Sequence, residues 1–344
     1  MSWGRKSLLF LGLVATLNVA GCSAEQGPVE CRASGSSMGT TWTVRVVAPP
    51  GWEDVRVEET VQAVLDRVDD AMSTWKEDSE LSRFNRARLG ADDWFTVSGL
   101  TAEVVARALH WWRESDGAFD VTVAPLVELW GFGRSAPASP PEPDVIEAAM
   151  NQIGSQHLSV RLDPPALRKA VPGLSLDLSA IAKGAAVDLV SEHLSELGCS
   201  AAMVEVGGEV RCSGTKLDGA VWSIGIEAPR AEVRRLDRVV TLADHSLASS
   251  GDYRNFILVD GQRMSHTLDP RSGRPSQHRL AGVSVIGPVC ADADAQCTAL
   301  MVLGPEEGYA WAVAQDLAAR LVLRDGDSFT VRCTPRFSRT HGED

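Results

Sequence analysis

The sequence has 344 residues, of which 44% are apolar and 23% charged, and its formal net charge is −13 at pH 7. This length and apolar content suit one large globular domain or two closely packed ones. An acidic chain without a cluster of lysines or arginines is a poor nucleic-acid binder. It would also need a metal ion or local cations to bind a polyphosphate.

The first 21 residues are typical of a secretory signal. Arg5 and Lys6 precede an apolar run over residues 8–20, which ends in V-A-G-C at Cys22. This run is short for a segment that crosses a bilayer. A cysteine directly after small residues resembles the bacterial lipobox, which implies cleavage before Cys22 and lipidation of its thiol. We therefore expect a lipoprotein anchored to a bacterial membrane on the periplasmic face.

The composition of the mature chain suggests three parts. Residues 22–36 are small and polar, which favours a flexible tether, residues 37–338 are expected to fold, and residues 339–344 form a tail. An even number of further cysteines permits disulfides in an exported protein, but their pairing cannot be read from the sequence. No C-x-x-C pair is present, so zinc or thioredoxin-like chemistry has little support. The six further cysteines are Cys31, Cys199, Cys212, Cys290, Cys297 and Cys333.

The first half of the chain alternates between clear periodic segments and turn formers. Alternating apolar residues predict a strand over residues 40–48, with a bend at Met38 and Gly39. Apolar spacings of three and four predict helices over 61–72 and 101–115. The stretch D-G-A-F-D-V-T-V-A-P-L-V-E-L-W-G-F-G, which starts at Asp116, has few charges and is expected to be buried.

The second half is richer in strands. A proline-rich surface excursion is expected over residues 135–143, and a strand passes into a helix near Asp177. Strands that come in runs with helices between groups favour an α+β fold over alternating βαβ units. Strands are predicted over 201–212, 221–227, 239–243, 255–260 and 280–286, and helices from Ala291 and over 306–318.

The strand-to-helix junction D-L-S-A-I-A-K-G-A-A-V-D, over 177–188, is the stretch around which the chain is organised. Small residues at such a junction leave backbone N–H and C=O groups accessible to an anion or a metal. Asp177 and Lys183 flank it with opposite charges. Alternatively, the stretch is a surface loop with one acid and one base.

A second stretch, A-D-A-D-A-Q-C-T, places Asp294 and Thr298 four residues apart. On a helix their oxygens share one face, and a carboxylate with a hydroxyl suits Mg²⁺ better than a softer metal. The alternative is a helix N-terminal acid that interacts with the helix dipole.

Two further stretches carry weaker signals. The turn-rich loop S-H-T-L-D-P-R-S-G-R-P contains His266, the best-placed candidate for proton transfer, and Asp269. A structural histidine is an equal alternative. The paired glycines of V-G-G-E, which ends at Glu209, would let a flat ligand approach the backbone.

The order of these motifs resembles the ApbE family over residues 38–337. The motifs are M-G-T-T, S-T-W, S-E-L-S-R-F-N, D-G-A-F-D-V-T-V-A-P-L, D-L-S-A-I-A-K-G, V-G-G, S-S-G-D-Y-R, S-H-T-L-D-P-x-x-G-R-P and A-D-A-x-x-T. The resemblance implies a single ApbE-like, T-fold-like α+β domain with antiparallel sheets and flanking helices. It also implies a magnesium-dependent enzyme that splits FAD, transfers FMN to a threonine hydroxyl of an exported redox protein and releases AMP.

Carried over by motif, the resemblance assigns the site residues. The backbone carbonyl of Ala180, the carboxylate of Asp294 and the hydroxyl of Thr298 would hold Mg²⁺. We expect His266 to deprotonate or position the acceptor threonine and Asp269 to orient the loop. FAD would be contacted by Met38, Trp75, Ala118, Phe119, Asp120, Asp177, Lys183 and Leu268.

Three positions depart from the pattern of many family members. Trp75 stands where many have tyrosine, Lys183 where some have an acid, and Cys297 where some have a second aspartate. A thiol is a poor Mg²⁺ ligand, so we expect FAD phosphates and water to complete the metal shell. Two alternative functions remain open: a magnesium-dependent FAD pyrophosphatase, and a non-catalytic FAD-binding lipoprotein.

Overall fold

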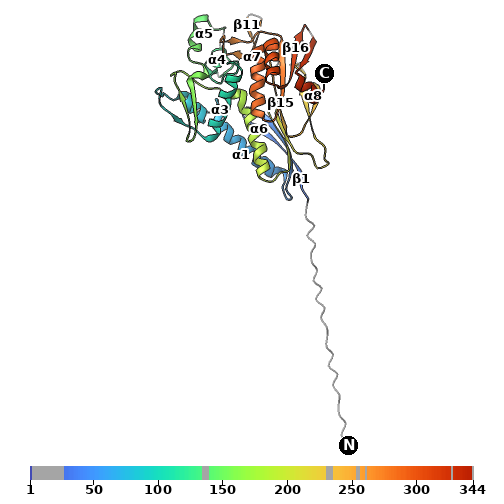
Figure 1. Ribbon diagram of the computed structural model, residues 1–344. Coiled ribbons are helices and arrows are strands. Elements are labelled where there is room, and N and C mark those ends of the chain that lie inside the picture. The colour runs from blue at the N-terminus through green and yellow to red at the C-terminus, as the bar shows by residue number, and fades with distance from the viewer. Residues whose placement is uncertain are drawn as a thin grey trace.

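The computed structural model in Figure 1 describes Met1 and residues 27–133, 139–229, 235–252, 256–259, 262–326 and 328–342. Cys22, the expected signal sequence and part of the expected proline-rich excursion lie outside these residues. The side chains of the strands at residues 256–259 and 262–264 are not described either.

A large antiparallel sheet is the centre of the fold, and its eight strands all lie in the described part of the chain. Every neighbouring pair is antiparallel, as expected for an α+β protein. In spatial order the strands are β1 (Val29–Ser37), β2 (Thr40–Ala48), β6 (Ala201–Val206), β7 (Glu209–Ser213), β10 (His245–Gly251), β15 (Leu280–Gly287), β16 (Ala318–Asp325) and β17 (Ser328–Cys333).

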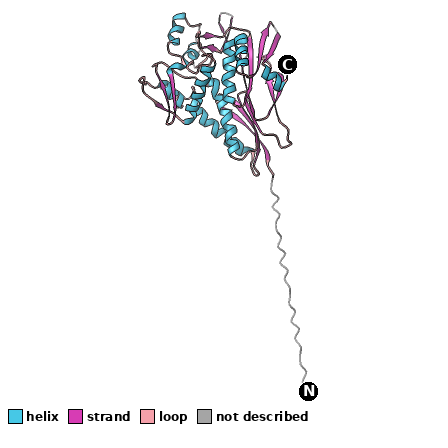
Figure 2. Cartoon of the chain, viewed as in Figure 1, coloured by secondary structure: helices cyan, strands magenta, loops and turns pink. Residues whose placement is uncertain are grey.

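Helices cover one face of this sheet (Figure 2). The buried side chains on that face form two apolar clusters. In the larger one, strand residues such as Val44 and Val204 pack with helix residues such as Val64 and Ile181. In the other, side chains of α7 such as Leu300 pack on strand residues such as Val285. Helix α8 packs instead on the second face, through Phe337. The described helices are α1 (Asp54–Met72), α2 (Glu80–Arg86), α3 (Gly99–Glu114), α4 (Ala124–Leu129), α5 (Pro143–Met150), the 3₁₀ helix at Ser155–His157, α6 (Ser179–Glu196), α7 (Cys290–Ala314) and α8 (Pro335–His341).

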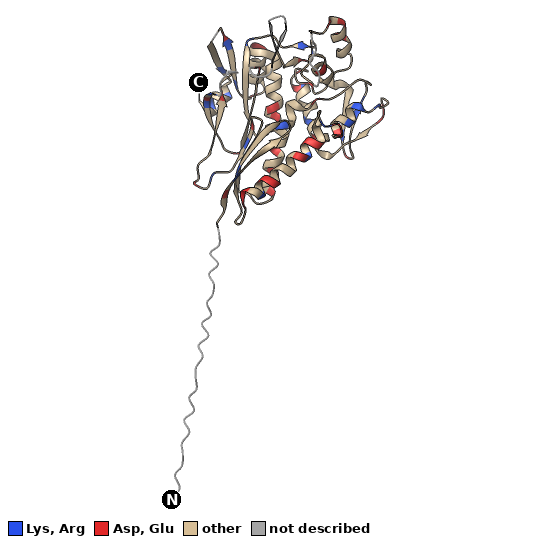
Figure 3. Cartoon of the chain, turned by 180° about the vertical axis from the view of Figure 1, so that it is seen from behind, with Lys and Arg blue, Asp and Glu red and all other residues tan. Residues whose placement is uncertain are grey.

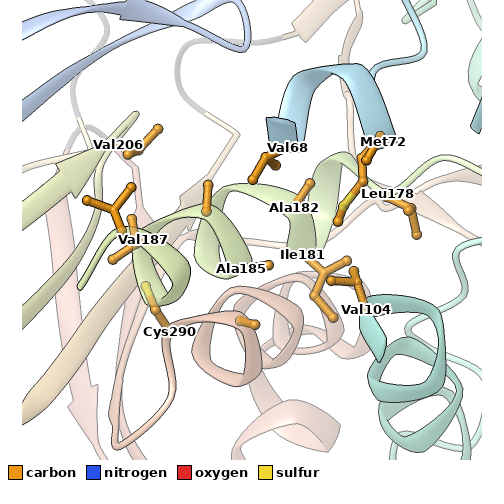
Figure 4. Packing of buried hydrophobic residues seen from close by; sticks show 14 of the residues in the cluster. Val68, Met72, Val104, Leu178, Ile181, Ala182, Ala185, Val187, Val206 and Cys290 are labelled. Atoms are coloured by element: carbon orange, nitrogen blue, oxygen red, sulfur yellow. The ribbon is translucent and has the colours of Figure 1, made fainter. Parts of the chain in front are cut away.

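Helix α6 is largely enclosed in this layer. Figure 4 shows Ile181, Ala182 and Ala185 on α6 between side chains of α1, such as Val68, and of α3, such as Val104. A strong one-sided apolar stripe is absent because small and apolar residues are buried around most of the helix. The start of α6 is thereby held rigidly against the core.

The second face of the large sheet is partly covered by a smaller sheet, in which Trp222 and Ile226 pack on Leu247 and Ile286. The smaller sheets are β3 (Phe95–Thr96), β5 (Pro165–Lys169) and β4 (Leu158–Leu162); β8 (Trp222–Glu227) with β9 (Leu236–Leu242); β11 (Phe256–Val259) with β12 (Gln262–Ser265); and β13 (Leu268–Asp269) with β14 (Arg274–Pro275).

The domain boundaries differ from the expected ones at both ends. The tether expected over 22–36 is shorter, because Val29–Ser37 forms β1 and pairs with β2 along its whole length. Cys31 of this strand is buried among core residues. The tail expected over 339–344 is also shorter, since α8 continues to His341.

Charges are spread over the surface. Figure 3 shows acidic residues on several helices, with lysines and arginines scattered between them. Of the six cysteines after Cys22, five are buried and none is bonded to another. Within the described ranges, we find no helix with the length and apolar character needed to cross a membrane.

Candidate active site

A cavity of about 940 Å³ opens where the start of α6, the first half of α7 and inner strands of the large sheet meet. It gathers residues that are more than 170 positions apart in the sequence. Ten of the predicted site residues line it: Ala118, Phe119, Asp120, Asp177, Ala180, Lys183, His266, Leu268, Asp294 and Thr298.

The predicted strand before Asp177 is wrong: residues 174–178 form no strand and lead directly into α6. The corner at Asp177 is instead fixed by hydrogen bonds on both sides. The Asp177 N–H donates to the carbonyl of Val121 at 2.8 Å, and the Asp177 carboxylate accepts from the Ser179 N–H at 2.8 Å. Asn85 exchanges two 2.8 Å bonds with the backbone of Leu176. The motif S-E-L-S-R-F-N therefore supports the corner through its last residue.

The two helices of the predicted metal site touch at a glycine. A Cβ added to Gly184 would lie 2.5 Å from the carbonyl oxygen of Cys290 and 2.7 Å from Cα of Ala291, so only glycine allows this approach. The Gly184 N–H donates to Asp294 Oδ2 at 3.1 Å. This amide is the i+4 partner that an α-helix assigns to the carbonyl of Ala180. Asp294 is thus attached to the turn that carries Ala180.

Lys183 lies between two buried carboxylates. Its Nζ is 2.7 Å from Oε1 of Glu209 and 3.9 Å from Oδ1 of Asp294. Burial raises the pKa of both carboxyls, and the nearby lysine opposes this effect. Burial disfavours the charge of Lys183, but Asp294 and Glu209 outweigh it and raise the pKa of the lysine. The positively charged ammonium group of Lys183 is therefore held at the cavity wall.

Asp120 lines the cavity, but its carboxylate is occupied by the protein. Oδ1 accepts from the N–H and the hydroxyl of Thr122 and from the hydroxyl of Ser155, and Oδ2 accepts from the Ser155 N–H. These four bonds hold the loop that carries Ala118 and Phe119. We infer that Asp120 stabilises the shape of the cavity wall.

The loop that carries His266 is held by hydrogen bonds within the loop and by one from Trp130. His266 follows β12 and lines the cavity, with its ring 6.4 Å from that of Phe132 in an edge-to-face contact. Asp269 does not line the cavity: its carboxylate accepts from the backbone and the guanidinium of Arg271. Trp130 donates to the carbonyl of Gly273 at 2.8 Å and ties the loop to α4.

Two predicted FAD contacts also lie outside the cavity lining. Met38 sits in the turn between β1 and β2 with φ +52° and packs against the core. Trp75 follows α1 and is 67% exposed. The role of both residues in FAD binding stays a prediction.

Cys297 faces away from the cavity. Its thiol is fully buried and donates to the carbonyl of Ala248 at 3.3 Å, and burial raises the pKa of this thiol well above its usual value. The side chain packs on the sheet and not toward Asp294 and Thr298. The structure therefore gives Cys297 no place in the predicted metal shell.

Glu209 is a residue of the site that was not predicted from the sequence. Only the glycines of V-G-G-E were considered, whereas the acid that follows them is 2% exposed and pairs with Lys183. The available signal was an acid directly after the paired glycines, at the first position of β7. Such an acid is rarely buried unless it is paired. The cavity also extends along the second face of the large sheet, to Thr43, Ser249 and Ser284.

Comparison with known proteins identifies the family. The profile of the ApbE family matches residues 38–321. The chain belongs to the ApbE family. A curated relative named FAD:protein FMN transferase, from Vibrio cholerae, is 39% identical over 321 residues, which is 93% of this chain and 94% of the relative. One of the same name from Escherichia coli K12 is 36% identical over 334 residues, 94% of this chain and 95% of the relative.

Solved structures of the ApbE family share the fold. The apo flavinyl transferase ApbE of Pseudomonas stutzeri gives a TM-score of 0.83 at 40% identity, over 92% of this chain and 98% of that one. The flavin transferase ApbE of Vibrio cholerae gives 0.82 at 37% identity, over 91% and 99% of the two chains. The expected fold and the expected class of enzyme, a flavin transferase, are confirmed.

Proposed function

We propose that this enzyme transfers FMN from FAD to a threonine hydroxyl of an exported protein in a Mg²⁺-dependent reaction that releases AMP. The observation that supports this most is the convergence of Ala180, Asp294 and Thr298 on one cavity that also holds the cation of Lys183. Its volume of about 940 Å³ lies at the upper end of the range of ligand pockets, as a dinucleotide requires.

The residues present fit a magnesium ion. They offer one carboxylate, one hydroxyl and one carbonyl, which are hard oxygen donors. The described residues contain no cluster of three or more His, Cys, Asp or Glu side chains arranged for a metal. A metal held here would therefore draw its remaining ligands from the diphosphate and water, as Mg²⁺ commonly does.

The reaction forms a bond between the threonine oxygen and the FMN phosphorus and breaks the bond from that phosphorus to the oxygen of AMP. Bound Mg²⁺ would act as a Lewis acid and a template for the diphosphate. Lys183 would offset the negative charge that phosphoryl transfer develops. His266 would accept the threonine proton or hold the hydroxyl in line.

Two variants test these roles on the mature protein with FAD, Mg²⁺ and an acceptor domain. Asp294→Ala should lower FMN transfer by at least 100-fold, because the metal loses its only carboxylate from this set. His266→Ala should stop transfer while the dissociation constant for FAD stays within about threefold of wild type. Transfer is read from a fluorescent acceptor band and AMP from chromatography.

The outcomes separate the candidate functions. AMP release that depends on the acceptor supports transfer. AMP release at the same rate without acceptor would identify an FAD pyrophosphatase instead, and binding of FAD without AMP release would identify a flavin-binding lipoprotein. Full turnover by Asp294→Ala would overturn the metal assignment.

A further inference from the structure

The ammonium group of Lys183 at the cavity wall lies closer to one of its two neighbouring acids than to the other. The ammonium of Lys183 is 2.7 Å from Glu209 but 3.9 Å from Asp294, the predicted metal ligand. The first distance is that of a charge-assisted hydrogen bond, and the second is not. The lysine thus lies beside the predicted metal ligand but is hydrogen-bonded to the other acid.

Glu209 contributes to the site through this lysine. Its side chain is 2% exposed, and its second oxygen, Oε2, is buried without a hydrogen-bond partner among the residues that the structure describes. A buried carboxylate with an unpaired oxygen is costly for a protein to keep. The fold gains little stability from such a group, which points to a role in the site.

The hairpin that carries Glu209 also confines the stem of the lysine. Gly207, in the turn between β6 and β7, has φ +64°, and a Cβ there would lie 3.2 Å from Cδ of Lys183. The turn therefore packs directly on the lysine side chain. The position of Lys183 is set by the same hairpin that supplies its closer acid.

We propose that Glu209 is a positioning residue that holds Lys183 away from Asp294 and so keeps the Asp294 carboxylate available to Mg²⁺. This inference rests on the metal site of the proposed function. Without Glu209, the lysine has one buried acid left within reach, and the two would form a direct ion pair. That pair and a divalent cation would compete for the same oxygen.

The proposal predicts that Mg²⁺ binding weakens when Glu209 alone is replaced and recovers when Glu209 and Lys183 are both replaced. Glu209→Leu leaves Lys183 free to pair with Asp294. In the double variant Glu209→Leu with Lys183→Met, no cation competes for Asp294. Replacing a buried ion pair by apolar residues of similar volume is commonly tolerated, whereas removal of a single partner is not. The double variant is therefore expected to fold.

The experiment is calorimetric titration of MgCl₂ into the mature protein without acceptor, at an FAD concentration ten times each variant's own dissociation constant. Glu209→Leu should weaken Mg²⁺ binding by at least tenfold. The double variant should return to within about threefold of wild type, even though the loss of Lys183 weakens its FAD binding. Glu196→Leu removes an exposed acid at the far end of α6 and should behave as wild type.

Two results would overturn the inference while leaving the proposed function intact: unchanged Mg²⁺ affinity in Glu209→Leu, or a double variant that binds as weakly as the single one. The second result would mean that Glu209 acts through structure or as a ligand. Absence of Mg²⁺ binding by the wild-type protein would overturn the proposed metal site and this inference with it.

Discussion

Trp75 is a predicted FAD contact that does not line the cavity, and 67% of its surface is exposed. We expect its ring to stack on a flat heterocycle of FAD. Such aromatic contacts contribute about 0.5–1.5 kcal/mol. We predict that Trp75→Ala raises the FAD dissociation constant by about 3- to 10-fold, measured by quenching of flavin fluorescence.

Trp94 provides a matched control for this change. It is another partly exposed tryptophan, and its ring lies 4.8 Å and 5.0 Å from the guanidinium groups of Arg161 and Arg168, outside the cavity lining. Trp94→Ala should leave FAD binding unchanged. Equal affinities of both variants and wild type would remove Trp75 from the binding site.

At the scale of single residues, the sequence predicted which positions gather but not what each does. Asp120, Asp269 and Asp294 each lie in a motif of the family, so the sequence alone does not distinguish their roles. The structure separates them by their partners: Asp120 accepts four hydrogen bonds, Asp269 pairs with Arg271, and Asp294 accepts one amide bond beside a lysine. Such partners come from distant segments, and spacing along the chain does not reveal them.

At the scale of elements, the contact between α6 and α7 decides whether the site can form. Asp188 of α6 accepts from the N–H groups of Cys290 and Ala291 at 3.0 and 2.9 Å, and so caps the start of α7. Gly184 lies one turn earlier in α6 against the same residues. Close packing and hydrogen bonds thus join α6 and α7 directly beside Asp294.

We predict that Gly184→Ala lowers the free energy of unfolding by about 1–3 kcal/mol, because the new methyl group would overlap backbone atoms that cannot rotate away. The displaced helices should also weaken Mg²⁺ binding severalfold. Denaturant unfolding and Mg²⁺ titration measure the two effects.

Gly99, at the start of α3, is the control for the glycine-to-alanine change. No atom lies within 4 Å of a Cβ added there, so Gly99→Ala should leave stability unchanged or raise it slightly. If Gly184→Ala is as stable as this control and binds Mg²⁺ normally, close helix contact is not a requirement of the site.

Strongly periodic elements were predictable, and elements defined by pairing were not. The strand over 40–48 and the helices α1 and α3 follow their apolar periods. The strand β10, with the sequence H-S-L-A-S-S-G, was missed because serine and glycine give no strand pattern, although it lies between β7 and β15. The strand predicted over 201–212 is two strands, joined at Gly207 and Gly208.

At the scale of the whole molecule, the chain enters the fold at the end opposite the cavity. Val29 at the start of β1 pairs with Ala48, whereas Ser37 pairs with Thr40, which lines the cavity. A nine-residue strand spans roughly 30 Å. In Figure 1 the start of β1 lies at one end of the molecule and α4, α5 and β11 at the other. A membrane anchor that precedes β1 would therefore join the fold at the end of β1 that lies away from the cavity.

This arrangement predicts that the proposed lipid on Cys22 determines location and not catalysis. Two or more acyl chains hold a protein stably on a bilayer, so wild-type protein expressed with its signal should sediment with membranes. Cys22→Ser should instead be found in the soluble fraction. Because the start of β1 lies about a strand's length from the cavity, both forms should flavinylate a soluble acceptor domain with equal kcat/KM. Mass spectrometry of the N-terminal peptide provides the direct measurement: an unmodified Cys22 in membrane-bound wild type would contradict the lipoprotein assignment, and a slower Cys22→Ser enzyme would show that the anchor affects the site.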